Sequence, residues 1–215
     1  MNFRYAAIAG LATAALAGCT HQGDIVVQEG VGITALRTTC PAVGIPDYTG
    51  DITLFSPPTA RTADAIDVTA TMTNVRDTCD DSGEKVYAVA NFDVFAQRRD
   101  TRGARTVQLP YFSAVVRGGD AVTAKRVGMV TLTFADGQAR AQASGAGSAY
   151  IDKASATLPA DIRERITRKR KAGEAEAAID PLSEPDIRAA LARANFELLI
   201  GFQLSNDQLA YNATR

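Results

Sequence analysis

The fold class is decided by a stretch in which apolar and polar side chains alternate without a break, Ile66-Asp67-Val68-Thr69-Ala70-Thr71-Met72-Thr73. Successive side chains of a strand point to opposite faces of its sheet, so strict alternation predicts a strand with one buried face. The same alternation returns twice further along the chain. The two apolar series are Val86, Ala88, Ala90, Phe92 and Val94, and then Phe196, Leu198, Ile200, Phe202 and Leu204.

Turn signals bound the other β segments. Gly118-Gly119 separates a segment rich in Val, Tyr and Phe at 106–117 from an apolar run at 121–134. Asp136-Gly137 predicts a hairpin between that run and the small-residue segment 138–151. We therefore expect about seven strands with turns at regular spacing.

Proline and glycine refine these strands. Pro110 cannot donate to a ladder, so it predicts an edge strand or a bulge. The short run Ile52-Thr53-Leu54-Phe55 lies within a Pro- and Gly-rich passage and predicts one short edge strand. The Gly, Ala and Ser residues of 143–149 predict a flat strand that allows close sheet packing, or a glycine bulge, in preference to a ligand-binding loop.

Helical signals are confined to 159–194 and the C-terminus. Pro159 occupies a first-turn position before the segment 161–171, and Ser183-Glu184-Pro185-Asp186 predicts a capping box at the start of a second helix. Ser205-Asn206-Asp207-Gln208 predicts the cap of a last short turn. The whole pattern predicts a mainly β fold, an antiparallel β-sandwich of immunoglobulin or fibronectin type III character with a helical insertion at about 159–194.

The N-terminus carries an export signal. Arg4 precedes the uncharged, Ala- and Leu-rich stretch 5–17, which has the length of a signal-peptide core and is too short for a permanent transmembrane helix. Leu16-Ala17-Gly18-Cys19 resembles the bacterial lipobox, which implies cleavage before Cys19 and lipid on its thiol and amine. An ordinary cleaved signal peptide with an incidental Cys and an uncleaved core helix are the alternatives.

This signal sets the expected domain organisation. We expect a signal peptide at 1–18, a lipidated Cys and flexible tether at 19–39, and a single domain at 40–215. The partner implied by lipidated Cys19 is the membrane, and the expected location is the periplasmic side of the cell envelope. By resemblance to well-studied lipoproteins, Thr20 in the position after the lipidated Cys favours the outer over the inner membrane.

The charge balance argues against nucleic-acid binding, and the cysteine content predicts one disulfide. Removing 1–18 takes away Arg4 and no acid, so the mature chain has 22 basic and 24 acidic residues, a balance that attracts no nucleic acid. With Cys19 acylated, Cys40 and Cys79 keep free thiols in an oxidising compartment, which favours a disulfide over two buried thiols. That crosslink stabilises the fold by about 4 kcal/mol in the chain-entropy model.

Catalytic and cofactor motifs are missing from the sequence. The single histidine is His21, in the tether, which excludes a Ser-His or Cys-His dyad from the domain. There is no nucleophile elbow, Walker loop or dinucleotide fingerprint, so we expect no cofactor and no catalytic residue. A carboxylate-dependent hydrolase is the least favoured alternative, with nothing to mark a pair among Asp93, Asp136, Asp152 and Glu197.

Two charged clusters merit separate interpretation. Asp77, Asp80, Asp81 and Glu84 could offer carboxylates to calcium, but the order of the loop fails the EF-hand pattern, so a solvated turn is favoured and no metal is expected. The second cluster places six cations in nine positions of an expected helix whose apolar stripe is Ile162 and Ile166. These cations are Arg163, Arg165, Arg168, Lys169, Arg170 and Lys171.

The basic cluster allows two interpretations. A solvated helix clamped to the sandwich by the two isoleucines is the favoured one. The functional alternative is contact with an anionic membrane surface, an anionic glycolipid or an acidic partner, at about 1 kcal/mol for each basic residue.

Several segments together resemble a group of uncharacterised bacterial envelope lipoproteins. These are the lipobox, Cys40-Pro41, Cys79, Leu109-Pro110-Tyr111-Phe112, Phe202-Gln203-Leu204 and Gln208-Leu209-Ala210-Tyr211-Asn212. The resemblance implies export and architecture, and no activity. We therefore expect a non-catalytic, membrane-anchored protein that scaffolds or assists an envelope assembly, with a binding module for a lipid, glycan or peptide as the main alternative. Which small molecule, if any, it takes is unknown.

Overall fold

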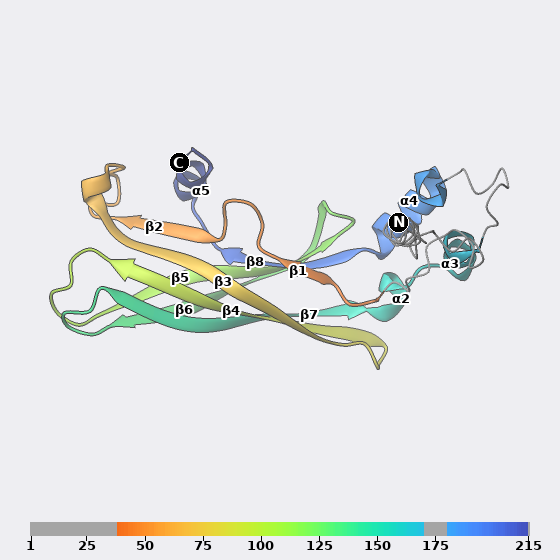
Figure 1. Ribbon diagram of the computed structural model, residues 1–215, viewed down its shortest axis with the longest axis horizontal. Helices are drawn as coiled ribbons and strands as arrows, with labels where there is room; N and C mark the ends of the chain where they lie inside the picture. The colour runs from red at the N-terminus through yellow and green to blue at the C-terminus, as the bar shows by residue number, and fades with distance from the viewer. Residues whose placement is uncertain (1–37, 170–179, 215) are drawn as a thin grey trace, which may run out of the picture.

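The protein is mainly β, with two four-stranded sheets and a few short helices. The computed structural model describes residues 38–169 and 180–214 (Figure 1). One sheet has the order β2-β3-β4-β7 and the other β1-β8-β5-β6. The strands are β1 (Ala42–Gly44), β2 (Asp51–Phe55), β3 (Ile66–Asp80), β4 (Lys85–Arg98), β5 (Arg105–Arg117), β6 (Ala121–Phe134), β7 (Arg140–Asp152) and β8 (Phe196–Phe202).

One hydrophobic core lies between the two sheets. Most of the alternating residues predicted to be buried are buried: Val68, Ala70 and Met72 of β3 share the core with the even-numbered apolar residues of β4 and β8. Ile66 and Leu204, at the ends of their series, are only partly buried. All neighbouring strands are antiparallel except β1, which runs parallel to β8. The short edge strand predicted at 52–55 is β2, whereas β1 was not predicted.

The small residues of β7 let the two sheets approach closely. A Cβ on Gly147 would lie 2.5 Å from Ile200 Cδ1 and 2.7 Å from Ser113 Cβ, both on the opposite sheet. A Cβ on Gly145 would collide with the ring of Phe92. The segment 143–149 thus packs closely on the core, as its composition predicts, and its pairing with β4 runs without a bulge.

Two expectations about strand pairing are wrong. Pro110 lies in β5, which is a central strand between β8 and β6. The Pro110 carbonyl accepts from Gln203 N at 2.9 Å, one residue beyond Tyr111 and Phe202, the last β5–β8 pair. Because the β5–β8 ladder ends there, the N–H that proline lacks is not needed for strand pairing. Asp136-Gly137 joins β6 to β7, but these strands belong to different sheets, so the turn is a crossover and not a hairpin.

Helices α2 (Lys153–Ala156), α3 (Ala160–Thr167) and α4 (Pro185–Ala194) lie together beyond one end of the strands (Figure 1). Ile162 and Ile166 are buried there, as expected. They pack in a separate apolar cluster with Ile187, Ala190 and Ala194 of α4, and not against the sheets as expected. The helices therefore have a small core of their own.

The helix caps differ from the sequence prediction in part. Pro159 is the N-cap of α3 and lies one position before the helix. Ser183 belongs to a short 3-10 helix, η5 (Pro181–Ser183), and Glu184 is the N-cap of α4 without a side-chain cap bond, so that capping box does not form. The cap predicted for the last helix, α5 (Asn206–Thr214), does form: Gln208 N donates to Ser205 Oγ, and Ser205 N donates to Gln208 Oε1.

The first described residues lie at the same end as α2, α3 and α4, which we call the tether end. The sulfur atoms of Cys40 and Cys79 lie at disulfide distance, with their Cα atoms 6.1 Å apart. Thr39 Oγ1 donates to Asp81 at 2.7 Å, and Lys153 Nζ of α2 donates to the Asp81 carbonyl. The hairpin of β3 and β4 is thus fastened to the segment that follows the expected tether.

Candidate functional site

The most densely bonded polar group of the described chain is the guanidinium of Arg98. Its side chain is 2 % exposed and donates to four backbone carbonyls, with distances from 2.7 to 2.9 Å. Two acceptors, Thr101 and Gly103, lie in the β4–β5 crossover, and the other two, Ala135 and Gln138, lie in the β6–β7 crossover. One side chain therefore fastens both crossovers between the sheets at the end opposite the tether.

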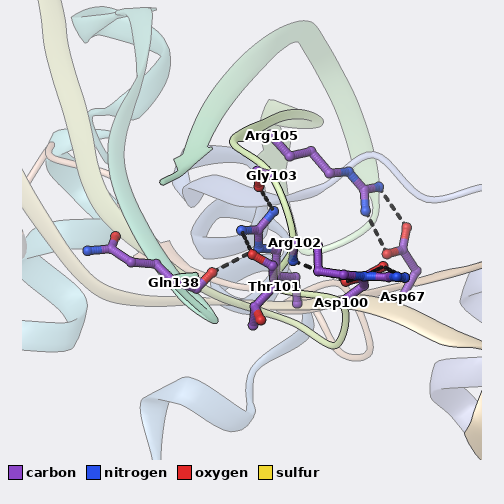
Figure 2. A network of polar contacts seen from close by, with 8 residues as sticks. Asp67, Asp100, Thr101, Arg102, Gly103, Arg105 and Gln138 are labelled. Atoms are coloured by element: carbon purple, nitrogen blue, oxygen red, sulfur yellow. Dashed lines mark hydrogen bonds and ion pairs between the residues drawn. The ribbon is translucent and has the colours of Figure 1, made fainter. Parts of the chain in front are cut away.

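Two ion pairs lie in the same polar network, Arg105 with Asp67 and Arg102 with Asp100 (Figure 2). Arg105 of β5 holds Asp67 of β3 through two hydrogen bonds of 2.6 Å, one from each terminal nitrogen. Arg102 pairs with Asp100, and its hydrogen bonds, with a smaller contribution from Arg98, hold the pKa of Asp100 well below its ordinary value. Arg99, Arg102 and Arg105 line a surface hollow beside these pairs. Arg99 donates to the carbonyls of Ala63 and Asp64, and the other two arginines donate to carboxylates, so these cations are held by the fold and offer no ready anion site.

The basic cluster is divided by the structure. Helix α3 ends at Thr167, so of the six cations only Arg163 and Arg165 lie in it. Arg165 is held by Asp186 and Glu184 of the α4 start, and the hydrogen bond from Arg165 is the main cause that lowers the pKa of Asp186. Arg163, Arg168 and Lys169 are exposed. Arg170 and Lys171, like Cys19, lie outside the described residues.

The acidic cluster lies at the tip of the β3–β4 hairpin and is held by local hydrogen bonds. Asp80 Oδ1 accepts from Ser82 N at 2.9 Å, which lowers the pKa of Asp80, and Asp81 accepts from Thr39. Asp77 and Asp80 are part of β3, which extends further than its alternation predicts because Asn74, at φ 53°, allows a bulge. Among residues 38–169 and 180–214 no group of three His, Cys, Asp or Glu side chains is placed to hold a metal ion.

The four carboxylates considered for hydrolysis are not brought together. Asp93 lies on β4 and accepts from Asn74 and Ser144, which lower its pKa in that order. Asp136 accepts from Gly103 N in the crossover, and Asp152 caps α2 at the other end of the strands. Glu197 begins the pairing of β8 with β1. Each has a structural position of its own.

Strand β6 has a long exposed surface that no other described strand covers. It is the last strand of its sheet, so one of its edges has no strand partner among the described residues. Every residue from Ala121 to Val127 is exposed, and Val122, Val127 and Met129 are 62 %, 60 % and 54 % exposed. A long edge strand with exposed apolar side chains is a template for pairing with another chain.

A shallow groove separates β6 from β7, which is the edge of the other sheet. Its volume is about 100 Å³, and its walls include Ala124 and Arg126 of β6 and Tyr150 of β7. Val115 and Leu198, both core residues, contribute to its lining. The two sheets are therefore open along this side.

Two tyrosines that are far apart in the sequence meet on the outer face of the other sheet. Tyr87 and Tyr150 pair across β4 and β7, with ring centroids 4.6 Å apart in a stacked arrangement. Tyr150 is 64 % exposed.

Comparisons with known proteins add no family. No family model matches the chain. A search of curated proteins and a search of solved structures likewise gave no match. Among the described residues, no helix has the length and apolar character needed to cross a membrane.

Sequence reasoning missed the two most informative features. Arg98 continues the buried series of β4 at every second position, so a cation at a core position was the available signal. The free edge of β6 carries no comparable signal, because strand order depends on contacts between distant segments.

Proposed function

We propose that this protein is an exported, lipid-anchored envelope protein without catalytic activity, which binds a protein partner and supports an envelope assembly. The observation that carries the proposal is the free edge of β6 with its exposed Val122, Val127 and Met129. By contrast, the polar clusters around Arg98, Arg165 and Asp81 are held by partners within the fold. The surface most suited to a partner is therefore a strand edge.

The arrangement of the ends supports this proposal. Cys40 follows the expected tether and lies at disulfide distance from Cys79, so the tether would leave the domain beside α2, α3 and α4. Exposed Arg163, Arg168 and Lys169 lie on this side, where they would face an anionic membrane surface. The edge of β6 runs from this end toward the crossovers and stays open to a partner.

The strand order supports an immunoglobulin or fibronectin type III relationship as part of the proposal. If β3 corresponds to strand A, then β3-β4-β7 follows the order A-B-E and β6-β5-β8 follows C′-C-F. The departure is β1, which lies parallel to β8 in the position where strand G runs antiparallel. The final antiparallel strand of such folds is replaced here by a short segment from the N-terminal side.

The test is crosslinking in intact cells, followed by gentle detergent extraction and mass spectrometry of the tagged protein. We expect one envelope protein in a fixed ratio to the wild type. A Cys19→Ala variant, which loses the expected lipid site, should fail to fractionate with membranes and lose that partner. Recovery of the wild-type protein alone would contradict the assembly function.

The stacked Tyr87 and Tyr150 favour a second candidate, binding of a glycan or peptide on the outer face of β4 and β7. Aromatic rings with exposed faces bind such ligands through apolar contact. Tyrosine fluorescence titrated with soluble cell-wall glycans distinguishes the two candidates. A saturable change that Tyr150→Ala removes would favour ligand binding, and an unchanged signal would eliminate glycan binding at these rings.

A further inference from the structure

We infer that the β6 edge takes an extended, acidic segment of the partner protein as an added antiparallel strand, lying over the groove between β6 and β7. This inference deepens the proposed function and rests on it, because it names the chemistry of the partner. Three features of this edge point to such an occupant: the direction of its free backbone groups, the groove beside them, and the charge near its centre.

The hydrogen-bonding groups of β6 point toward solvent at known positions. Pro110 pairs with Met129, has no N–H, and directs its carbonyl to Gln203 on the β8 side. In an antiparallel ladder such a pair is not hydrogen-bonded, so both residues turn their backbone groups away from each other. The N–H and C=O of Met129, and by the two-residue period those of Val127 and Thr131, therefore face the free edge.

A strand added at the β6 edge would contact apolar side chains on both the outer and the inner face of the sheet. On the outer face it would lie beside Val127 and Met129, which already pair with Phe112 and Pro110 of β5. On the inner face its side chains would enter the groove lined by Ala124, Arg126, Tyr150, Val115 and Leu198. A single extended segment would thus hydrogen-bond to the free backbone groups of β6 and also cover the groove between β6 and β7.

Two cations near the centre of the β6 edge favour an acidic partner segment. Lys125 and Arg126 are both exposed, and Lys125 Nζ lies 4.8 Å from the centre of the Phe112 ring on the outer face. Arg126 lines the groove on the inner face and has no ion pair with a described residue. Adjacent carboxylates on the incoming strand would oppose both cations, and opposite charges directly across a ladder are stabilising.

The same two cations disfavour a second copy of this chain as the occupant. If two β6 edges paired antiparallel about residue 125, Lys125 would face Lys125 of the other copy, and pairing about residue 126 would set Arg126 against Arg126. Like charges directly opposite destabilise a sheet. Self-pairing centred on either cation is therefore disfavoured, whereas an acidic strand can pair there.

The experiment uses the full lipidated protein in detergent micelles and a labelled ten-residue peptide in which Val and Thr alternate around a central Glu-Asp pair. Fluorescence anisotropy measures binding, and hydrogen exchange measures protection of β6. We expect saturable binding with slower exchange at Val127 and Met129. A matched peptide with Lys-Arg at its centre should bind about tenfold more weakly or not at all.

Three variants locate the contact. Met129→Pro removes an edge donor without removing a β5–β6 hydrogen bond and should abolish peptide binding. Arg126→Glu, which leaves the backbone intact, places one cation and one carboxylate at the centre of the edge and should abolish the preference for the acidic peptide. Arg140→Glu, an exposed charge reversal on β7, is the control and should bind as the wild type does.

Equal binding of both peptides, or unchanged acidic-peptide binding by Arg126→Glu, would overturn the inference. These results are separable from failure of the proposed function. An envelope partner that co-purifies equally with the wild type, Met129→Pro and Arg126→Glu would refute the strand-addition site and leave the assembly function standing.

Discussion

At the scale of single residues, stability depends on a few buried side chains that donate hydrogen bonds to backbone carbonyls. Arg98 is the clearest case, because its guanidinium satisfies four carbonyls in two crossovers and packs 5.2 Å from the centre of the Phe134 ring. The charge is balanced by carbonyl oxygens and not by a buried carboxylate. A single side chain thus sets the path of the chain between the sheets.

We expect Arg98→Met to lower the free energy of unfolding by roughly 3 kcal/mol or more, because the replacement leaves buried carbonyls without donors. Urea denaturation followed by circular dichroism measures the change. Arg102→Met is the matched control: Arg102 is exposed and its ion pair is screened by solvent, so its loss should cost far less than the loss of Arg98. Equal losses for the two variants would contradict the role given to Arg98.

Gly147 is the second sensitive residue. A methyl group there would press on Ile200 and Ser113, so Gly147→Ala should destabilise the protein by about 1–3 kcal/mol through overpacking. Gly44 provides the control, since a Cβ at that position meets no atom within 4 Å. Thermal unfolding should separate the two variants, and a neutral Gly147→Ala would contradict the close packing of the sheets.

At the scale of elements, the sequence predicted strands better than helices. Period-two alternation is a local pattern that directly reports one buried face, so β3, β4 and β8 follow from it. The extension of β3 beyond Thr73 does not, since it depends on a bulge at Asn74 and on pairing with β4. The capping box at Ser205 forms because both of its partners are local, whereas Ser183 is drawn into a 3-10 helix capped by Asp180.

The contact between α3 and α4 should depend on pH. Arg165 lowers the pKa of Asp186 below its ordinary 3.8, so the ion pair contributes its full stability above pH 3.8. That contribution is lost as the pH falls through the lower, folded-state pKa. The protection of α3 amides, measured relative to their intrinsic exchange rates at each pH, should therefore fall only below pH 3.8.

The Asp186→Asn variant tests this pH dependence. It should show faster exchange in α3 at neutral pH and less change on acidification than the wild type. High salt should reduce the difference, since the pair is exposed and screened. A variant that retains the full pH response would place the titrating group elsewhere.

The crosslink between Cys40 and Cys79 joins β3 to the segment after the tether. Cys79→Ser should lower stability by about 4 kcal/mol in the chain-entropy model for the enclosed loop. Mass spectrometry of the non-reduced protein should show the wild type two hydrogens lighter than its reduced form. Two free thiols in the exported wild type would contradict the pairing.

At the scale of the whole molecule, the sequence predicted a mainly β fold but not how its strands are assembled. Asp136-Gly137 has the composition of a hairpin, yet the Arg98 contacts make it a crossover between sheets. The candidate site could not be predicted from the sequence for the same reason. The pairing of Tyr87 with Tyr150 and the free edge of β6 follow from register and strand order, which involve residues far apart in the chain.

The β6 edge is the proposed binding site for a protein partner in the cell envelope. A photo-crosslinking amino acid placed in intact cells at Val127 on that edge, or at Phe95 on the outer face of the other sheet, tests this directly. We expect one discrete adduct from Val127 that disappears with Arg126→Glu, and none from Phe95. Adducts of equal yield from both positions, or an adduct unaffected by Arg126→Glu, would contradict it.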